Sequence, residues 1–159
     1  MLVTINTDAS FKDGFGGYAF WIVCDAGKIQ KAGMIKSKAN TSADTETMCI
    51  ANAIHTLKHS RFNGITKVII NTDSKESIKL LTGKSRCKVS NPLFKVVEEC
   101  IFNMMELCLK LGLSIRDVHS LIEFRWVKAH NGRRDARSFV NDWCDKEAKK
   151  YCNLRIKQG

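Results

Sequence analysis

A single proline stands among the 159 residues, and no apolar run is long enough to span a bilayer. With an apolar fraction of 44%, this scarcity of proline excludes the disordered and collagen-like classes of protein. The first residues, MLVTINTD, also lack the charged start and apolar stretch of a signal peptide. We therefore expect a soluble protein of the cytoplasm that does not contact a membrane.

The cysteine spacing of a zinc ribbon is also missing. None of the seven cysteines forms a C-x-x-C pair, and their odd number argues against a disulfide framework. His55 and His59 lie four residues apart, a spacing that could hold a metal on one helix face. No acidic residue lies between them, so a solvated helix surface is the better interpretation. This composition suits a reducing compartment.

Acidic residues are outnumbered, because 16 aspartates and glutamates stand against 26 lysines and arginines, for a formal net charge of +10. Such an excess attracts polyanions, of which nucleic acid is the commonest in a cytosol. Charge alone does not decide between nucleic-acid binding and a merely soluble surface.

The length suits one domain, residues 1–159, with a single hydrophobic core. We expect a glycine-rich loop at KDGFGG (12–17) and irregular structure in the basic segment GKSRCKVSN (83–91). Strands and helices alternate after an initial hairpin, which predicts an α/β domain with one mixed sheet covered by helices. The predicted strands are 2–8, 18–25, 28–36, 68–73 and 122–127, and the predicted helices are 42–58, 74–81, 92–111 and a last one around 140–151.

The tetrapeptide Ile-Asn-Thr-Asp occurs twice, ending in Asp8 and in Asp73, and each copy is predicted to close a strand. If the two strands are parallel neighbours, both aspartates emerge at the carboxyl edge of the sheet, where α/β proteins bind ligands. Each aspartate alone is better explained as a turn or helix-capping residue. Their coincidence favours a functional site.

Glu46 lies on the same helical stripe as Ile50, Ile54 and Leu57, so it is predicted to face the sheet. A carboxylate on a core-facing stripe is costly unless something compensates its charge. A cation does so, particularly if Asp8 points to the same place. The alternative is a glutamate placed early in its helix because the dipole favours it.

The final helix contributes Asp145, one position from its apolar stripe, with Asp142 as a competitor for the same role. In isolation, either is better interpreted as a surface charge. Several carboxylates at one spot cannot all ionise without a counter-charge, and oxygen ligands select Mg²⁺ or Mn²⁺ over zinc. Two such ions, about 4 Å apart, are a common device for displacement at a phosphodiester.

Six sequence elements occur in an order that resembles type 1 ribonuclease H. They span nearly the whole chain, and no single one is decisive. The elements are TDAS (7–10), GGY (16–18), Glu46 on its helix, NTDS (71–74), WVKAHNG (126–132) and NDWCDKEA (141–148).

The resemblance implies a ribonuclease H-like fold, a five-stranded mixed sheet in the order 3-2-1-4-5 flanked by helices. It implies an endonuclease that cuts the RNA strand of RNA–DNA hybrids with two Mg²⁺ ions, for which Mn²⁺ substitutes, leaving 5′-phosphate and 3′-hydroxyl ends. Asp8 would bridge both ions, Asp145 would complete one site, and Glu46 and Asp73 would complete the other. His130, from the WVKAHNG motif, would assist proton transfer or product release.

Several positions depart from the family pattern. Ala9 stands where a glycine often follows the first aspartate, and Ser42, Ala43 and Lys75 stand where the family has side chains that help to read the RNA 2′-hydroxyl. The basic protrusion of some members is expected to be short or absent, and we expect no separate hybrid-binding domain before the catalytic unit. We expect a monomer without an obligatory protein partner. The substrate-binding residues that the resemblance implies are Ser10, Asn40, Thr41, Ser42 and Lys75, and phosphate contacts are possible at Lys84, Arg86, Lys88, Arg133, Arg134 and Arg137.

Three other interpretations remain open. Another nuclease of the superfamily, such as a junction resolvase, would use similar carboxylates, but WVKAHNG is typical of ribonuclease H. A nucleic-acid-binding module without catalysis need not keep four carboxylates and a histidine. A plain structural domain leaves the core-facing Glu46 unexplained.

Overall fold

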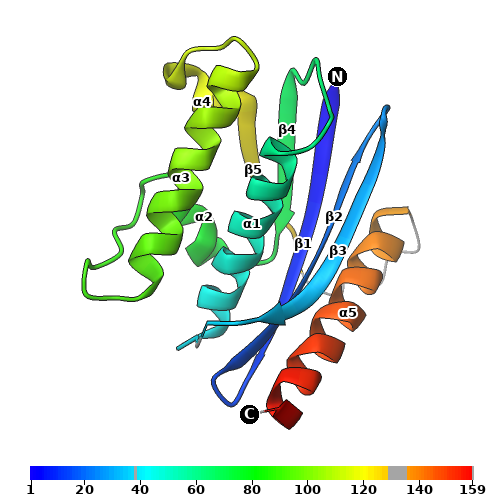
Figure 1. Ribbon diagram of the computed structural model, residues 1–159, viewed down its shortest axis with the longest axis vertical. Coiled ribbons are helices and arrows are strands. Elements are labelled where there is room, and N and C mark those ends of the chain that lie inside the picture. The colour runs from blue at the N-terminus through cyan, green and yellow to red at the C-terminus, as the bar shows by residue number, and fades with distance from the viewer. Residues whose placement is uncertain (38, 129–135, 159) are drawn as a thin grey trace.

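The computed structural model describes residues 1–37, 39–128 and 136–158, with side chains in the last range from residue 139 onward. Within these residues, five strands and five α-helices follow one another, with the 3₁₀ turn η1 (Ile115–Asp117) before α4 (Figure 1). The strands are β1 (Leu2–Lys12), β2 (Phe15–Cys24), β3 (Gly27–Ile35), β4 (Lys67–Thr72) and β5 (Ile122–Trp126), and the helices are α1 (Ser42–Lys58), α2 (Lys75–Leu81), α3 (Leu93–Lys110), α4 (Val118–Leu121) and α5 (Ala136–Gln158).

The five strands form one mixed sheet in the order β3-β2-β1-β4-β5, which confirms the predicted α/β fold and strand order. Strand β2 is antiparallel to both β1 and β3, whereas β4 is parallel to β1 and to β5. The crossover from β3 to β4 runs through α1, and the crossover from β4 to β5 runs through α2, α3 and α4. Parallel pairing therefore places the end of β4 beside the middle of the longer β1, and the end of β5 beside the end of β4.

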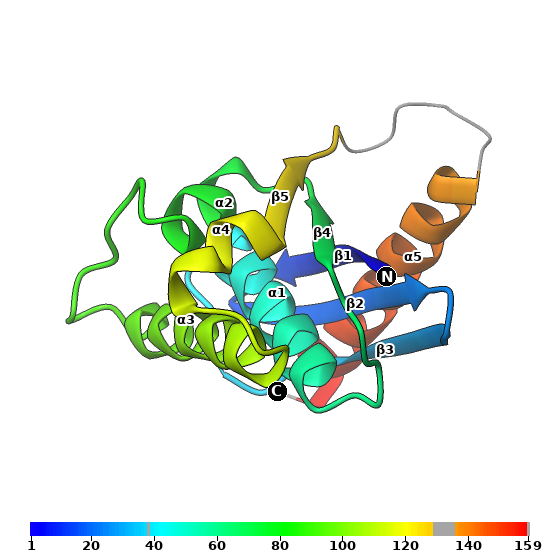
Figure 2. The same cartoon turned by 90° about the horizontal axis from the view of Figure 1, so that it is seen from above.

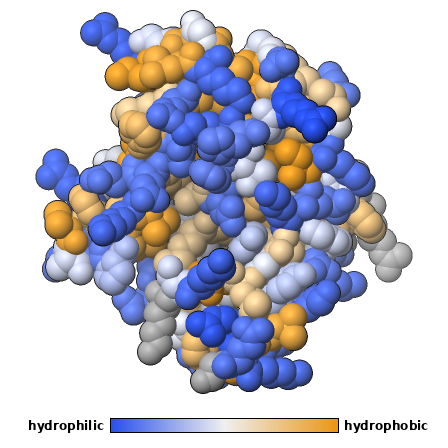
Figure 3. Space-filling model, viewed as in Figure 1, coloured by the Kyte–Doolittle hydropathy of each residue, from blue (hydrophilic) through white to orange (hydrophobic). Residues whose placement is uncertain are grey.

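Helices cover both faces of the sheet, as the view from above shows (Figure 2). The main core lies between the sheet and helices α1 and α3, and it includes the fully buried Phe20 of β2. The preceding residue of β2, Ala19, points to the opposite face of the sheet and packs against Cys144 and Ala148 of α5. This alternation follows from the two-residue period of a strand. The face that carries α1 and α3 is largely hydrophilic, with apolar side chains in small separate groups (Figure 3).

The prediction of a glycine-rich loop at residues 12–17 is wrong, because β1 continues to Lys12 and β2 begins at Phe15. Only Asp13 and Gly14 turn the chain, both with positive φ. Gly17 pairs within the sheet as part of β2, and a helix backbone passes directly over it. A Cβ at this position would lie 2.1 Å from the carbonyl oxygen of Ala148 in α5. The glycine is a point of close packing rather than a loop signal.

The bounds of α1, α2 and α3 agree with the predicted ones to within one residue, whereas α5 extends past the expected 140–151 at both ends. Thr41 caps α1 by accepting a hydrogen bond from the backbone N–H of Asp44, and Ser74 caps α2 in the same way through Ser77. The buried residues of α3 include Cys100 and Leu107, whereas Ile101 and the C-cap Leu111 are only partly buried. The short elements η1 and α4 were not predicted.

His55 and His59 are exposed on α1, as expected for a solvated surface, with ring centroids 4.5 Å apart. The described helices include none that is both long and apolar enough to cross a bilayer.

Candidate active site

The two Ile-Asn-Thr-Asp segments lie side by side in the sheet. Parallel pairing of β1 with β4 aligns Asn6 with Asn71, so that Asp8 and Asp73, two residues further on, emerge at the same edge. The expectation that both aspartates close a strand holds only for Asp73, which follows the end of β4. Asp8 lies in the middle of β1, paired with Ala19 of β2, because β1 runs on into a hairpin.

Glu46 joins the two aspartates from the first turns of α1. It is only 5% exposed, which agrees with its predicted orientation toward the sheet. The backbone N–H of Ala9 donates to its Oε1 at 2.8 Å, and the hydroxyl of Thr72 donates to its Oε2 at 3.3 Å. The same Ala9 N–H also donates to Asp8 Oδ1 at 2.9 Å. Ligand oxygens of Asp8, Glu46 and Asp73 all lie within 4.8 Å of one another, and we call these residues the carboxylate cluster.

Burial and mutual repulsion raise the affinity of this cluster for positive charge. Burial, followed by the negative charge of Asp73, raises the pKa of Asp8 from 3.8 to about 7. The same two causes, with the charge of Asp8 in addition, raise the pKa of Glu46 well above 4.5. In the part of the chain that the structure describes, no lysine or arginine forms an ion pair with these three carboxylates. A bound cation or a proton would relieve the repulsion between these carboxylates.

The donor set of the cluster fits a hard divalent cation. Two buried thiols lie near it, but Cys49 donates to the carbonyl oxygens of Asp8 and Ala19, and Cys144 to that of Asn6. Burial raises the pKa of both thiols above 9.0, so that neither offers a thiolate. The cluster is therefore an all-oxygen site, of the kind that prefers Mg²⁺ or Mn²⁺ to zinc.

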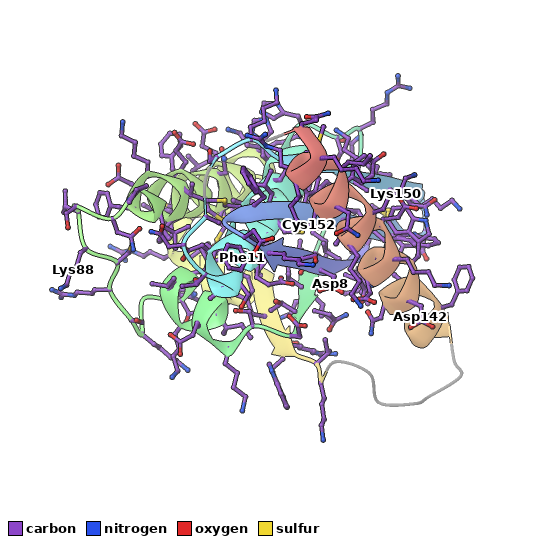
Figure 4. The ribbon with its side chains drawn as sticks, turned by 90° about the horizontal axis from the view of Figure 1, so that it is seen from below. Asp8, Phe11, Lys88, Asp142, Lys150 and Cys152 are labelled. Atoms are coloured by element: carbon purple, nitrogen blue, oxygen red, sulfur yellow. The ribbon has the colours of Figure 1, made fainter. Side chains whose placement is uncertain are left out.

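Asp145 of α5 lies beside the cluster without belonging to it. It lines one cavity with Asp8 and Asp73, and its charge contributes to the raised pKa of Asp8. Its Oδ2 accepts a hydrogen bond from Lys149 at 3.0 Å. Asp142 lines the same cavity but is exposed, at the start of α5 (Figure 4). Of the two candidates, Asp145 is more closely coupled to Asp8.

A second hollow adjoins the cluster on the side of Glu46 and Asp73. Ser42 and Lys75, two of the residues that the family resemblance associates with substrate, both line it. Trp126, at the end of β5, closes the hollow and was not singled out from the sequence. It opens the WVKAHNG motif, so the motif contained the signal, but its position beside Asp73 depends on the pairing of β5 with β4.

Of the other residues implied by the resemblance, those that the structure describes line neither hollow. Thr41 is engaged as the cap of α1, and the backbone N–H of Asn40 donates to Asp44 Oδ2 at 3.0 Å. Ser10 is half-buried in the β1–β2 hairpin, opposite Gly17. Lys84, Arg86 and Lys88 are exposed in the irregular segment between α2 and α3, whereas His130, Arg133, Arg134 and the side chain of Arg137 lie outside the described residues.

Comparisons with known proteins identify the family and agree with the fold. Residues 2–153 match the family model described as RNase H. The chain is similar in structure to the N-terminal RNase H domain of a Mycobacterium tuberculosis protein, solved as a fusion with maltose-binding protein, with a TM-score of 0.66 and 17% identity over 99% of this chain and 97% of that one. No curated protein matches the sequence.

Two further solved structures share the fold. RNase H1 from the halophilic archaeon Halobacterium salinarum has a TM-score of 0.65 at 14% identity, over 96% of this chain and 98% of that one. LC11-RNase H1, solved in complex with an RNA/DNA hybrid, has a TM-score of 0.65 at 12% identity, over 97% of this chain and 99% of that one.

Proposed function

Since the chain belongs to the RNase H family, we propose that it is a metal-dependent endonuclease that hydrolyses the RNA strand of RNA–DNA hybrids. The observation that carries the proposal is the carboxylate cluster, in which three side chains from β1, α1 and the end of β4 bring their oxygens within 4.8 Å. Repulsion between clustered carboxylates destabilises a purely structural domain, whereas a cation site needs such a cluster to bind the ion. Similarity to a protein solved with an RNA/DNA hybrid supports the choice of substrate.

Asp8, Glu46 and Asp73, with Asp145 completing the set, would hold two Mg²⁺ ions, for which Mn²⁺ substitutes. When bound, these ions would activate the attacking water and stabilise the leaving 3′ oxygen, which leaves 5′-phosphate and 3′-hydroxyl ends. The protein orients the carboxylates in advance, because the Ala9 N–H holds Asp8 and Glu46 together and the Thr72 hydroxyl fixes the second oxygen of Glu46. Such preorganisation avoids reorganisation during the reaction.

The remaining roles stay proposals. His130 is proposed to assist proton transfer or product release, and Ser10, Asn40, Thr41, Ser42 and Lys75 are proposed to contact the substrate. Their order along the chain matches the family motifs. A cytoplasmic location and a monomeric state stay predictions from the sequence.

The test is a cleavage assay with Mg²⁺ on a strand-labelled RNA–DNA hybrid, with duplex DNA and duplex RNA in parallel. We expect cleavage of the RNA strand in the hybrid alone, its loss in Asp73→Asn and a reduced turnover in His130→Ala. Cleavage of duplex RNA as well would keep the chemistry and relax the specificity. Tight binding without cleavage of any substrate would favour a non-catalytic nucleic-acid-binding module, and cleavage of branched DNA alone would favour a resolvase.

A further inference from the structure

The second hollow, of about 450 Å³, is contiguous with the carboxylate cluster because Glu46 and Asp73 line both. Its other lining side chains include Ser42 of α1, Lys75 and Glu76 of α2, and Trp126 of β5, and Lys75 is the one basic residue among those that the structure describes there. A strand whose scissile phosphate lies on the cluster therefore places a neighbouring nucleotide in this hollow. Trp126 and Lys75 are the aromatic and the basic side chain with which the hollow can contact that nucleotide.

The indole of Trp126 is held in place by a hydrogen bond and is still exposed to solvent. Its Nε1–H donates to the backbone carbonyl oxygen of Asp73 at 3.1 Å, which ties the end of β5 to the residue that carries a cluster carboxylate. The side chain is nevertheless 47% exposed. An aromatic ring fixed at one edge and open on its face is a surface for a sugar or a base.

The ammonium group of Lys75 lies over this ring, with Nζ 4.3 Å from the ring centroid. Within the described residues it forms no ion pair, whereas the neighbouring Glu76 pairs with Lys79 on the next turn of α2. A cation–π contact of this kind is weak at an exposed site, so that a better partner displaces it readily. An ammonium has three donors and no acceptor, and its best partner on a nucleic-acid strand is a phosphate.

We infer that Lys75 and Trp126 form a nucleotide subsite beside the cluster, in which Lys75 binds a phosphate next to the scissile one. Trp126 has two tasks in this subsite. Its ring keeps the ammonium close to the strand, and its Nε1–H positions Asp73. The inference rests on the proposed function, because it assumes that the scissile phosphate of a nucleic-acid strand lies at the carboxylate cluster. It adds that the neighbouring phosphate is recognised by its charge.

The first test measures the affinity of the Asp73→Asn protein for an RNA–DNA hybrid as a function of salt, with and without Lys75→Met. Losing one phosphate contact is expected to reduce the slope of log K against log salt by about 0.9. Lys75→Arg should keep the slope. Lys67→Met is the control, because it removes an equal charge at the opposite end of β4 from Asp73, outside the hollow, and its slope should stay unchanged. An unchanged slope in Lys75→Met would overturn the phosphate contact.

The second test separates the two tasks of Trp126. Trp126→Phe keeps a ring under Lys75 but removes the hydrogen bond to Asp73, so the Mg²⁺ concentration for half-maximal activity should rise several-fold with little change in KM for the hybrid. Trp126→Leu should raise KM as well, because the ring is gone. Thermal unfolding of each variant shows whether it folds. Equal effects of the two substitutions on KM, in folded proteins, would remove the ring from the subsite.

The two proposals fail in different ways. Cleavage of the hybrid by the unaltered protein, together with an unchanged slope for Lys75→Met, leaves the proposed function intact and removes only the subsite. A protein that cuts no nucleic acid but loses a phosphate contact in Lys75→Met loses the proposed function and keeps the subsite.

Discussion

Asp73→Asn is expected to stabilise the metal-free protein above neutral pH, although it removes a carboxylate that the proposed reaction needs. In the folded protein the pKa of Asp8 is about 7, against 3.8 in an unfolded chain. Between these two values the unfolded chain releases its proton first, so stability falls as the pH rises. The loss is complete above about pH 7, and at 1.36 kcal/mol per pKa unit it amounts to about 4 kcal/mol.

Burial causes the larger part of this penalty and remains in Asp73→Asn, because the backbone does not move. The charge of Asp73 is the second cause, and the substitution removes it. We expect a gain of about 1 kcal/mol at pH 8, which raises Tm by about 2–4 °C in a domain of this size. At pH 4 or below, Asp8 is protonated in the folded protein, so the two proteins should differ little.

The assay is thermal unfolding with a metal chelator, at pH 4 and at pH 8, for the unaltered protein and for Asp73→Asn. Adding Mg²⁺ at pH 8 provides the complementary measurement, because a ligand at 100 times its Kd stabilises by about 2.7 kcal/mol. That gain should largely disappear in Asp73→Asn. An equal or lower Tm of Asp73→Asn at pH 8, or an equal response of both proteins to Mg²⁺, would refute the reasoning.

Three further predictions concern single side chains. Asp145→Asn should reduce kcat by about 100-fold or more, as expected for an electrostatic catalytic group. Asp142→Asn removes an exposed charge and should reduce kcat by less than about fivefold. Steady-state cleavage of the hybrid compares the two variants. Gly17→Ala should cost about 3 kcal/mol or more in urea unfolding, because its Cβ would lie 2.1 Å from the carbonyl oxygen of Ala148. Thr41→Ala removes the cap of α1 and should cost about 1 kcal/mol in the same experiment, with Thr41→Ser as the control that keeps it.

Much of the fold follows from local pattern. The stripe through Ile50, Ile54 and Leu57 predicted both the span of α1 and the inward orientation of Glu46, and the structure confirms them. The repeated Ile-Asn-Thr-Asp predicted that Asp8 and Asp73 meet, and parallel pairing of β1 with β4 places them at one edge. These features were predictable because helical period and strand alternation are properties of neighbouring residues.

Other features depend on contacts between distant parts of the chain. The composition of KDGFGG predicts a loop, yet Gly17 lies in a strand. A glycine is needed there because α5, more than a hundred residues later, passes over it. Trp126 has no local feature that predicts its hydrogen bond to Asp73, which joins residues 53 positions apart. Glycine content and aromatic character do not say which backbone will come close.

The sequence by itself determined the order of the strands and of the helices other than the short α4, the core-facing carboxylate and the family to which the motifs belong. Only the tertiary structure decided how close the three carboxylates come, how far burial raises the pKa of Asp8, and which side chains form the neighbouring hollow. The physical reason is that residue type and spacing are local, whereas electrostatic repulsion and desolvation depend on the distances between groups after β1, α1 and β4 have packed together.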